Sequence, residues 1–295
     1  MSIALPFVLA CAVCGAGEKT LPSNGAEVAF AGRKRATLEL RAASFETTDH
    51  VLRVVELRAE PGLAMAVGAS TIVAADVPVL RRSLALEQRV PVGPLAPPAP
   101  AADRTSHTTS LGDVELRATH TAWKSEPAVV TERLTIAAGV KLPTAPLEHD
   151  PAGVLVHPDL QPGCGSIVPL VAISYAWTSS LWSAWTGASL LFPVEVRAGS
   201  HPGDSLRASF TLQLQPARVL ATRLGVHGRL DSTGELDGEP VRRSGGASVF
   251  AAPELVASPT QDVVVSIGAA FPIIQEMRGY RATSPVLLAS VGVDF

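Results

Sequence analysis

Charge, aromatic rings and cysteine are all scarce in this sequence. Charged residues make up 17% of the 295 residues and aromatic residues 5%, and there are three cysteines. Globular proteins usually carry about 25% charged residues, and the mean hydropathy of +0.27 is high for a soluble chain. The net charge of −3 gives no indication of a nucleic-acid partner, and we expect none.

Catalytic and cofactor-binding signatures are absent as well. The sequence has no G-x-S-x-G, H-E-x-x-H or C-x-x-C-H motif and no phosphate-binding loop, and its seven histidines are scattered. We therefore predict that the chain is not an enzyme and uses no cofactor and no metal. Residues 148–159, "EHDPAGVLVHPD", could supply metal ligands, but a solvated acidic external loop is the preferred interpretation. His120 falls on the apolar side of its segment, where a catalytic role would need a nucleophile that we do not find.

The N-terminal end resembles an export signal. Residues 1–10 have the short apolar core of a signal peptide but lack Lys and Arg in front, as a signal truncated at its start would. Cleavage there would leave Cys11 first, and "VLAC" also resembles a lipoprotein acceptor site. We assign residues 11–35 to a periplasmic N-terminal segment, in which Cys11 and Cys14 pair with each other or remain free. Cys164 is interpreted as a small loop residue.

The chain does have a strong period of two. In "SLRASFTLQLQ" (205–215), Leu, Ala and Phe occupy the even positions, and Ser, Arg, Thr and Gln the odd ones. Such alternation is typical of β-strands with one apolar and one polar face. The uncharged stretch 160–194 is predicted to be a hairpin with its turn in "AWTSSLW", rather than a transmembrane helix. In all we predict about twelve strands, near 36–46, 51–67, 71–81, 111–123, 129–142, 166–178, 181–195, 204–215, 218–231, 246–256, 261–272 and 284–295.

Alternation fits both a soluble sandwich and a membrane barrel, so other features must decide between them. Many strands reach ten residues, enough to cross the hydrocarbon at a tilt, and long connections alternate with short ones. A sheet edge cannot stay open in lipid, so the last strand has to pair with the first. We therefore predict an all-β fold, a transmembrane antiparallel β-barrel over residues 36–295, with Phe295 as the C-terminal signal of the closing strand.

In such a barrel the polar faces line the lumen. The lumen-lining candidates are Glu39, Arg41, Glu56, Arg58, Asp113, Glu115, Arg117, Arg133, Lys141, Arg207, Gln213 and Arg223. These mixed charges either satisfy one another and plug the pore, or define a narrow polar path that selects permeants. We expect partial interfacial belts from the few aromatic residues, Trp123, Trp177, Trp182, Trp185, Phe192, Tyr280 and Phe295.

Several stretches, taken in order, resemble a known family. They include "LGDVELRA" (111–118), "AAGVKLPT" (137–144), "LQPGCGS" (160–166) and the run from "GGASVF" to "EMRGY" (245–280). The pattern is similar to that of the outer-membrane transporters named after the meta-pathway of phenol degradation, over about residues 110–295. Cys164 and "PIIQEMRG" depart from the family's usual "PGTGS" and "PVYQ".

The resemblance implies a channel of the bacterial outer membrane that passes small aromatic or hydrophobic molecules through a narrow charged lumen. The implied partners are outer-membrane lipid, the barrel-assembly machinery and a small-molecule permeant. A structural or partner-binding barrel of an exported complex is the alternative, and an outer-membrane hydrolase is a third and weaker one.

Overall fold

The structure is a computed structural model. It describes residues 34–47, 52–86, 104–125, 130–153, 156, 160–194, 200–201, 203–236, 239–240 and 244–295. The predicted signal peptide lies outside these residues, and so does the N-terminal segment except for its last two residues.

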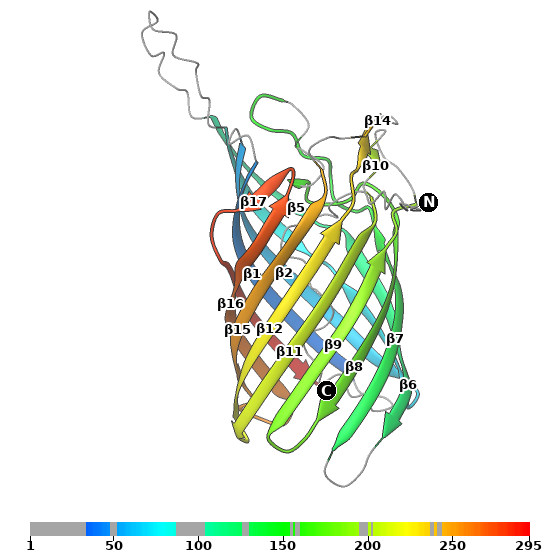
Figure 1. Ribbon diagram of the computed structural model, residues 1–295. Helices are drawn as coiled ribbons and strands as arrows, with labels where there is room; N and C mark the ends of the chain where they lie inside the picture. Colours follow the sequence, from blue (N-terminus) through cyan, green and yellow to red (C-terminus); the bar gives the residue numbers. More distant parts are fainter. Residues whose placement is uncertain are drawn as a thin grey trace, which may run out of the picture.

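The described residues form a single antiparallel barrel (Figure 1). Its wall has twelve strand positions, two of which are made of two consecutive strands, and the predicted number is confirmed. The wall strands are β1 (Lys34–Thr47), β2 (Leu52–Val67), β3 (Thr71–Asp76) with β4 (Val79–Leu86), β5 (Arg104–Leu111) with β6 (Val114–Ser125), β7 (Thr131–Leu142), β8 (Val168–Thr178), β9 (Trp182–Leu191), β11 (Ser205–Ala217), β12 (Leu220–Asp231), β15 (Gly246–Ala257), β16 (Val263–Met277) and β18 (Val286–Asp294). Four short strands lie near one rim: β10 (Ser200–His201), β13 (Glu235–Leu236), β14 (Glu239–Pro240) and β17 (Tyr280–Ala282).

The barrel is closed by pairing of the first and last wall strands. β1 runs antiparallel to β18, in register from Arg35 opposite Asp294 to Ala42 opposite Leu287. The backbone of Phe295 extends this pairing, because its N–H donates to the Lys34 carbonyl and its carbonyl accepts from the Lys34 N–H, both at 2.9 Å. The sheet therefore has no open edge at this seam, as the sequence predicted for the closing strand.

Two neighbouring wall strands are interrupted at the same height. β3 gives way to β4 at Val77 and Pro78, and β5 gives way to β6 at Gly112 and Asp113. The two breaks are joined, since the Gly112 N–H donates to the Pro78 carbonyl at 2.8 Å. A Cβ at Gly112 would lie 2.8 Å from the Leu80 side chain and 2.9 Å from the Pro78 ring, so only glycine allows this approach.

The barrel has the polarity of a membrane-spanning protein. Along β11, Leu206 and Phe210 are exposed on the outer face, whereas Arg207 and Thr211 are only 3% and 4% exposed. The same inversion holds for β18, where Leu287 is 59% exposed and Val286 is buried. Large apolar side chains thus face outward around the wall, and charged ones are enclosed, which is the reverse of a soluble sandwich.

The two ends of the barrel differ in their connections (Figure 1). At the turn end, where the C-terminus lies, short segments join β2 to β3, β8 to β9 and β11 to β12. At the opposite, loop end, longer segments join β4 to β5, β7 to β8 and β12 to β15. The predicted hairpin is confirmed, because β8 and β9 pair directly and the Ser179 N–H donates to the Trp182 carbonyl at 2.8 Å. Within the described residues, no helix is long and apolar enough to span a membrane.

The aromatic belts are only partly as expected. Trp123, Trp182 and Phe295 are exposed at the turn end, and Trp177 occupies the same outer face of β8, so a girdle exists there. Phe192 is exposed near the loop end. Two assignments were wrong. Trp185 lies on the inner face of β9, because it alternates with Leu190 and Trp182 on the outer face. Tyr280 is 5% exposed and packs inside against Phe45.

Candidate functional site: the lumen

The loop-end half of the lumen contains an apolar cluster. Phe45 and Tyr280 meet edge to face there, with ring centroids 5.9 Å apart. Around them lies a buried group that we call the upper apolar cluster: Ala43, Phe45, Leu52, Val54, Leu84, Val156, Leu160, Ala252, Ala270, Met277, Tyr280, Ala282 and Val286. The sequence analysis missed this cluster, since it treated the whole inner face as polar.

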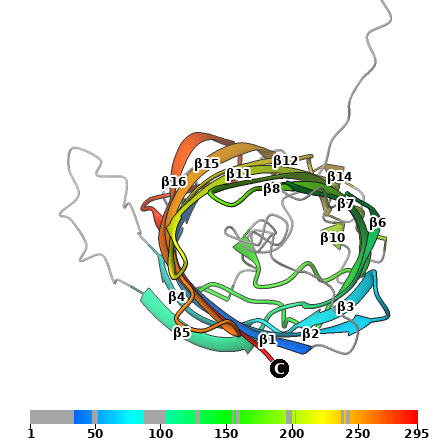
Figure 2. The ribbon, with the colours of Figure 1, turned by 90° about the horizontal axis from the view of Figure 1, so that it is seen from below.

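The connection between β7 and β8 folds into the barrel and supplies part of this cluster. Figure 2 shows green segments of the chain crossing the interior, in the colours of this connection. We call residues 143–167 the inner loop. Its residues Val156 and Leu160 are each 2% exposed and pack in the upper apolar cluster. The interpretation of residues 148–159 as a solvated external loop was therefore wrong for Glu148, Val156 and their surroundings, although His149 is exposed.

A buried arginine on the wall holds the inner loop. Arg82 of β4 is 2% exposed and forms ion pairs with Glu148 of the loop and with Glu56 of β2, the latter at 3.1 Å. It also donates to the Leu160 carbonyl. The other carboxylate oxygen of Glu148 accepts from the Thr108 hydroxyl of β5. Arg82 thus joins two strands to both halves of the loop, and Glu148 adds a third; charge-assisted bonds of this kind are the strong ones.

A second wall residue holds the two ends of the loop. The carboxylate of Asp113 accepts from the backbone N–H of Ala145 at 3.1 Å and from that of Cys164 at 2.6 Å. Cys164 is disulfide-bonded, so its interpretation as a plain loop residue was wrong. The sequence contains two further cysteines, Cys11 and Cys14.

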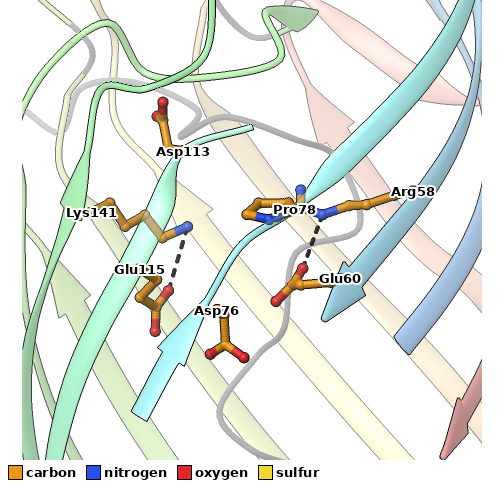
Figure 3. Close-up of a pocket in the computed structure, with 7 residues that line it drawn as sticks. All are labelled: Arg58, Glu60, Asp76, Pro78, Asp113, Glu115 and Lys141. Carbon is orange, nitrogen blue, oxygen red and sulfur yellow. Dashed lines mark hydrogen bonds and ion pairs between the residues drawn. The ribbon is translucent and has the colours of Figure 1, made fainter. Parts of the chain in front are cut away.

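The middle of the lumen holds a small polar pocket beside the strand breaks (Figure 3). It leaves about 10 Å³ of free space, roughly the room that one ordered water needs. Two ion pairs line it, Arg58 to Glu60 at 3.0 Å and Lys141 to Glu115 at 3.8 Å (Figure 3). Its lining consists of Arg58, Glu60, Asp76, Pro78, Asp113, Glu115 and Lys141.

Next to this pocket, charged side chains from opposite walls meet. Arg207 of β11 lies within charge–charge range of Arg41 on β1 and of Arg229 on β12. Lys141 of β7 is in range of the same Arg207 and Arg229. We call the whole group, with its bonded partners, the mid-lumen cluster: Glu39, Arg41, Glu115, Arg117, Lys141, Arg207, Arg229 and Asp231.

The turn-end half of the lumen is polar and more sparsely charged. Arg223 donates to Gln213 at 3.1 Å and to Glu254 at 3.2 Å, and its guanidinium carbon lies 5.6 Å from the centre of the Trp185 ring. This cation–π contact explains how a tryptophan is accommodated on the inner face. Arg35 and Asp294 close the seam below with two hydrogen bonds of 2.5 and 2.7 Å.

All twelve lumen-lining candidates point inward. Glu39, Arg41, Glu115, Arg117, Lys141 and Arg207 are in the mid-lumen cluster, Arg58 and Asp113 line the adjoining pocket, and Glu56, Gln213 and Arg223 bind the partners described above. Arg133 shares its face of β7 with Lys141 by parity. Inner residues that the prediction missed include Glu60, Asp76, Arg82, Glu148, Trp185, His227, Arg229, Asp231 and Glu254. Strand parity alone could have added Glu60, Arg229 and Asp231, whereas Glu148 carries no such signal.

The described residues contain no group of three or more His, Cys, Asp and Glu side chains arranged to hold a metal ion. His120 lies on the outer face of β6, as parity predicted, and its Nδ1 is 3.0 Å from the Thr71 hydroxyl. That pair is exposed.

Comparison with known proteins supports the fold. No family model and no curated protein matches the chain. Among solved structures, an outer-membrane channel from Pseudomonas putida F1 is similar with a TM-score of 0.70 and 10% identity, covering 93% of this chain and 100% of that one. The transport unit of the autotransporter AIDA-I from Escherichia coli gives a TM-score of 0.51 at 7% identity, covering 93% of each chain. At such identities the likeness establishes the fold, which is that of a bacterial outer-membrane β-barrel.

Proposed function

We propose that the chain is a channel of the bacterial outer membrane that passes small molecules with an aromatic or hydrophobic part. The observation that carries this proposal is the arrangement of the inner face. A wall that is apolar outside encloses the upper apolar cluster at the loop end, followed by the charged mid-lumen cluster. The fold that the chain shares with the Pseudomonas putida channel supports the proposal, as does the resemblance to the meta-pathway transporters.

The upper apolar cluster and the mid-lumen cluster have separate roles in this proposal. The upper apolar cluster offers a surface on which an apolar molecule can leave water, at about 25 cal/mol for each Å² of apolar surface covered. The mid-lumen cluster offers fixed charges and hydrogen-bond donors, which select by charge and size. A small molecule would cross the upper apolar cluster by partitioning out of water. It would cross the mid-lumen cluster by taking the place of one partner in an internal ion pair.

A structural barrel is the second candidate, and close packing of the lumen favours it. Arg207, Lys141 and Arg82 are each at most 3% exposed, so ion pairs fill the interior where the described wall residues meet. A barrel whose charges only satisfy one another would serve as a membrane anchor for an exported complex. The hydrolase alternative has no observation in its favour.

Electrical recording separates the two candidates. Purified protein that migrates as a compact species until it is boiled should be inserted into a planar bilayer. A channel gives discrete conductance steps, and Arg117→Ala and Arg207→Ala change their size. Arg218→Ala, in the exposed turn between β11 and β12, is the matched control and leaves them unaltered. Compact protein that never conducts would support the structural barrel instead.

A further inference from the structure

The upper apolar cluster is closed to solvent, although the proposed function needs its surface. Its members are at most 9% exposed, and Phe45 and Tyr280 are 2% and 5% exposed. A permeant can cover this surface only where a group that now covers it has moved away. Among the members, Val156 and Leu160 come from the inner loop and the others from strands, whose backbones are fixed by pairing.

The inner loop reaches these strands from across the lumen. It begins and ends on β7 and β8, whereas Phe45 lies on β1 and Tyr280 on β17. Around the wall, β6, β3 and β2 separate β7 from β1, and β9, β11, β12, β15 and β16 separate β8 from β18. The loop therefore lies across the bore, as the green segments inside the barrel in Figure 2 show.

The loop is a unit with hydrogen bonds of its own. The side chain of Gln161, which is 5% exposed, accepts from the Glu148 N–H at 2.8 Å and donates to the carbonyls of Glu148 and Val156 at 3.0 and 2.7 Å. The Val156 N–H in turn donates to the Glu148 carbonyl at 3.0 Å. These bonds stay within the loop, so none of them has to break when the loop leaves the cluster.

The polar attachments of the loop described above lie on one side of the barrel. They come from Arg82 of β4, Thr108 of β5 and Asp113 between β5 and β6. Asp113 accepts from the backbone near both ends of the loop and so fixes the place about which the rest can move. Toward β1 and β17 the loop presents the side chains of Val156 and Leu160, which an apolar molecule can replace without leaving a polar group unpaired.

The wall also provides for a released loop. Arg82 is 2% exposed and would become a buried unpaired charge if Glu148 were its only partner. Its second ion pair, with Glu56 of the adjacent β2 at 3.1 Å, belongs to the wall and remains when the loop leaves. The same arginine thus has a partner in both positions of the loop.

We infer that the inner loop is a gate, and that Val156 and Leu160 occupy the place where the apolar end of a permeant binds. A molecule that ends in an aromatic ring or a branched alkyl group takes this place against Phe45 and Tyr280 when the loop is released. Because the docked loop and the permeant exclude each other, the permeant binds the released state and shifts the equilibrium toward it. This inference rests on the proposed channel function and adds its gate and the kind of group that opens it.

Hydrogen exchange of the full-length protein in detergent tests the displacement without any need for conductance. The probes are benzyl alcohol and, as a polar ring of similar size, myo-inositol. We expect saturating benzyl alcohol to speed exchange of the inner-loop amides, including that of Val156, at least about tenfold, and myo-inositol to have no effect. Amides of β11 and β12 should keep their rates. Inner-loop exchange that is unchanged or slower with benzyl alcohol, or equally faster in β11, would overturn the inference.

Single-channel recording in planar bilayers tests the gate itself. Leu160→Ser and, independently, Val156→Ser remove apolar contacts of the docked loop and should each raise the fraction of time spent open at least about tenfold. Leu147→Ser is the matched control, because it makes the same change on the same loop at a side chain that is 36% exposed, and it should resemble the parent. Equal open fractions in parent, Leu160→Ser and Val156→Ser would overturn the gate and leave the channel function standing. Compact parent and compact variants that all fail to conduct would overturn the proposed function and the inference with it.

Discussion

The inner loop offers the sharpest test of how the lumen is built, through the substitution Glu148→Gln. In the structure the Glu148 carboxylate is buried against Arg82 and Thr108, and its backbone accepts from the Val156 N–H at 3.0 Å. Breaking a buried ion pair costs about 3–5 kcal/mol when the remaining charge is left alone. Arg82 keeps its second partner, Glu56, at 3.1 Å, so its charge is not left alone. We therefore expect the cost of Glu148→Gln to lie at the lower end of this range.

A loss of about 3 kcal/mol corresponds to roughly a 100-fold change in the equilibrium between the docked and the released inner loop. Hydrogen exchange of the detergent-solubilised protein, followed by mass spectrometry, measures this shift directly. Amides of the inner loop, including those of Ala145 and Val156, should exchange about 100-fold faster in Glu148→Gln. Amides of β11 and β12 should be unaffected, because the wall does not depend on the loop.

Asp150→Asn is the matched control, since it removes a carboxylate two residues away that accepts a hydrogen bond from the Ala152 N–H within the loop. It should leave exchange at Val156 close to the parent rate. If Glu148→Gln exchanged no faster than Asp150→Asn, the claim that the Arg82 ion pair docks the loop would be refuted.

Three further predictions concern the wall and the disulfide. Arg35→Ala should lower the temperature at which the compact band is lost on gels. In a double-mutant cycle with Asp294→Ala, the two decreases in that temperature should not be additive, and additive decreases would mean that this pair does not stabilise the contact between β1 and β18. Phe210→Arg, on the outer face at mid-strand, should cost about 2–4 kcal/mol of folding stability in urea-titrated liposomes, whereas Val219→Arg in the exposed turn should cost close to nothing. Cys164 should resist alkylation in denatured, unreduced protein and react after reduction; a reactive Cys164 before reduction would contradict the disulfide.

The strands could be predicted because their signal is local. Alternation in β11 and β18 needs only the chain itself, and closure follows from the physics of a sheet edge in lipid. The same rule, applied strictly, would have placed Trp185 inside, since it stands an odd number of residues from Trp182 on one strand. That error came from treating tryptophan as an interfacial residue by type rather than by position.

The interior of the loop end could not be predicted in this way. Glu148 is buried because Arg82, 66 positions earlier, lies on the facing wall. Val156 and Leu160 likewise enter the barrel because a chamber of apolar side chains exists to receive them. Such contacts join a connecting segment to distant strands, and neither periodicity nor composition within the segment reports them.

The central claim is that this wall separates lipid outside from charge within, residue by residue. Nitroxide labels at each position from 205 to 215 of β11, in protein reconstituted into liposomes, test it through collision with oxygen and with a polar nickel chelate. We predict a period of two, with high oxygen accessibility at 206, 208, 210 and 212 and low values at the positions between them. An accessibility profile without this alternation, or with the opposite phase, would contradict the account.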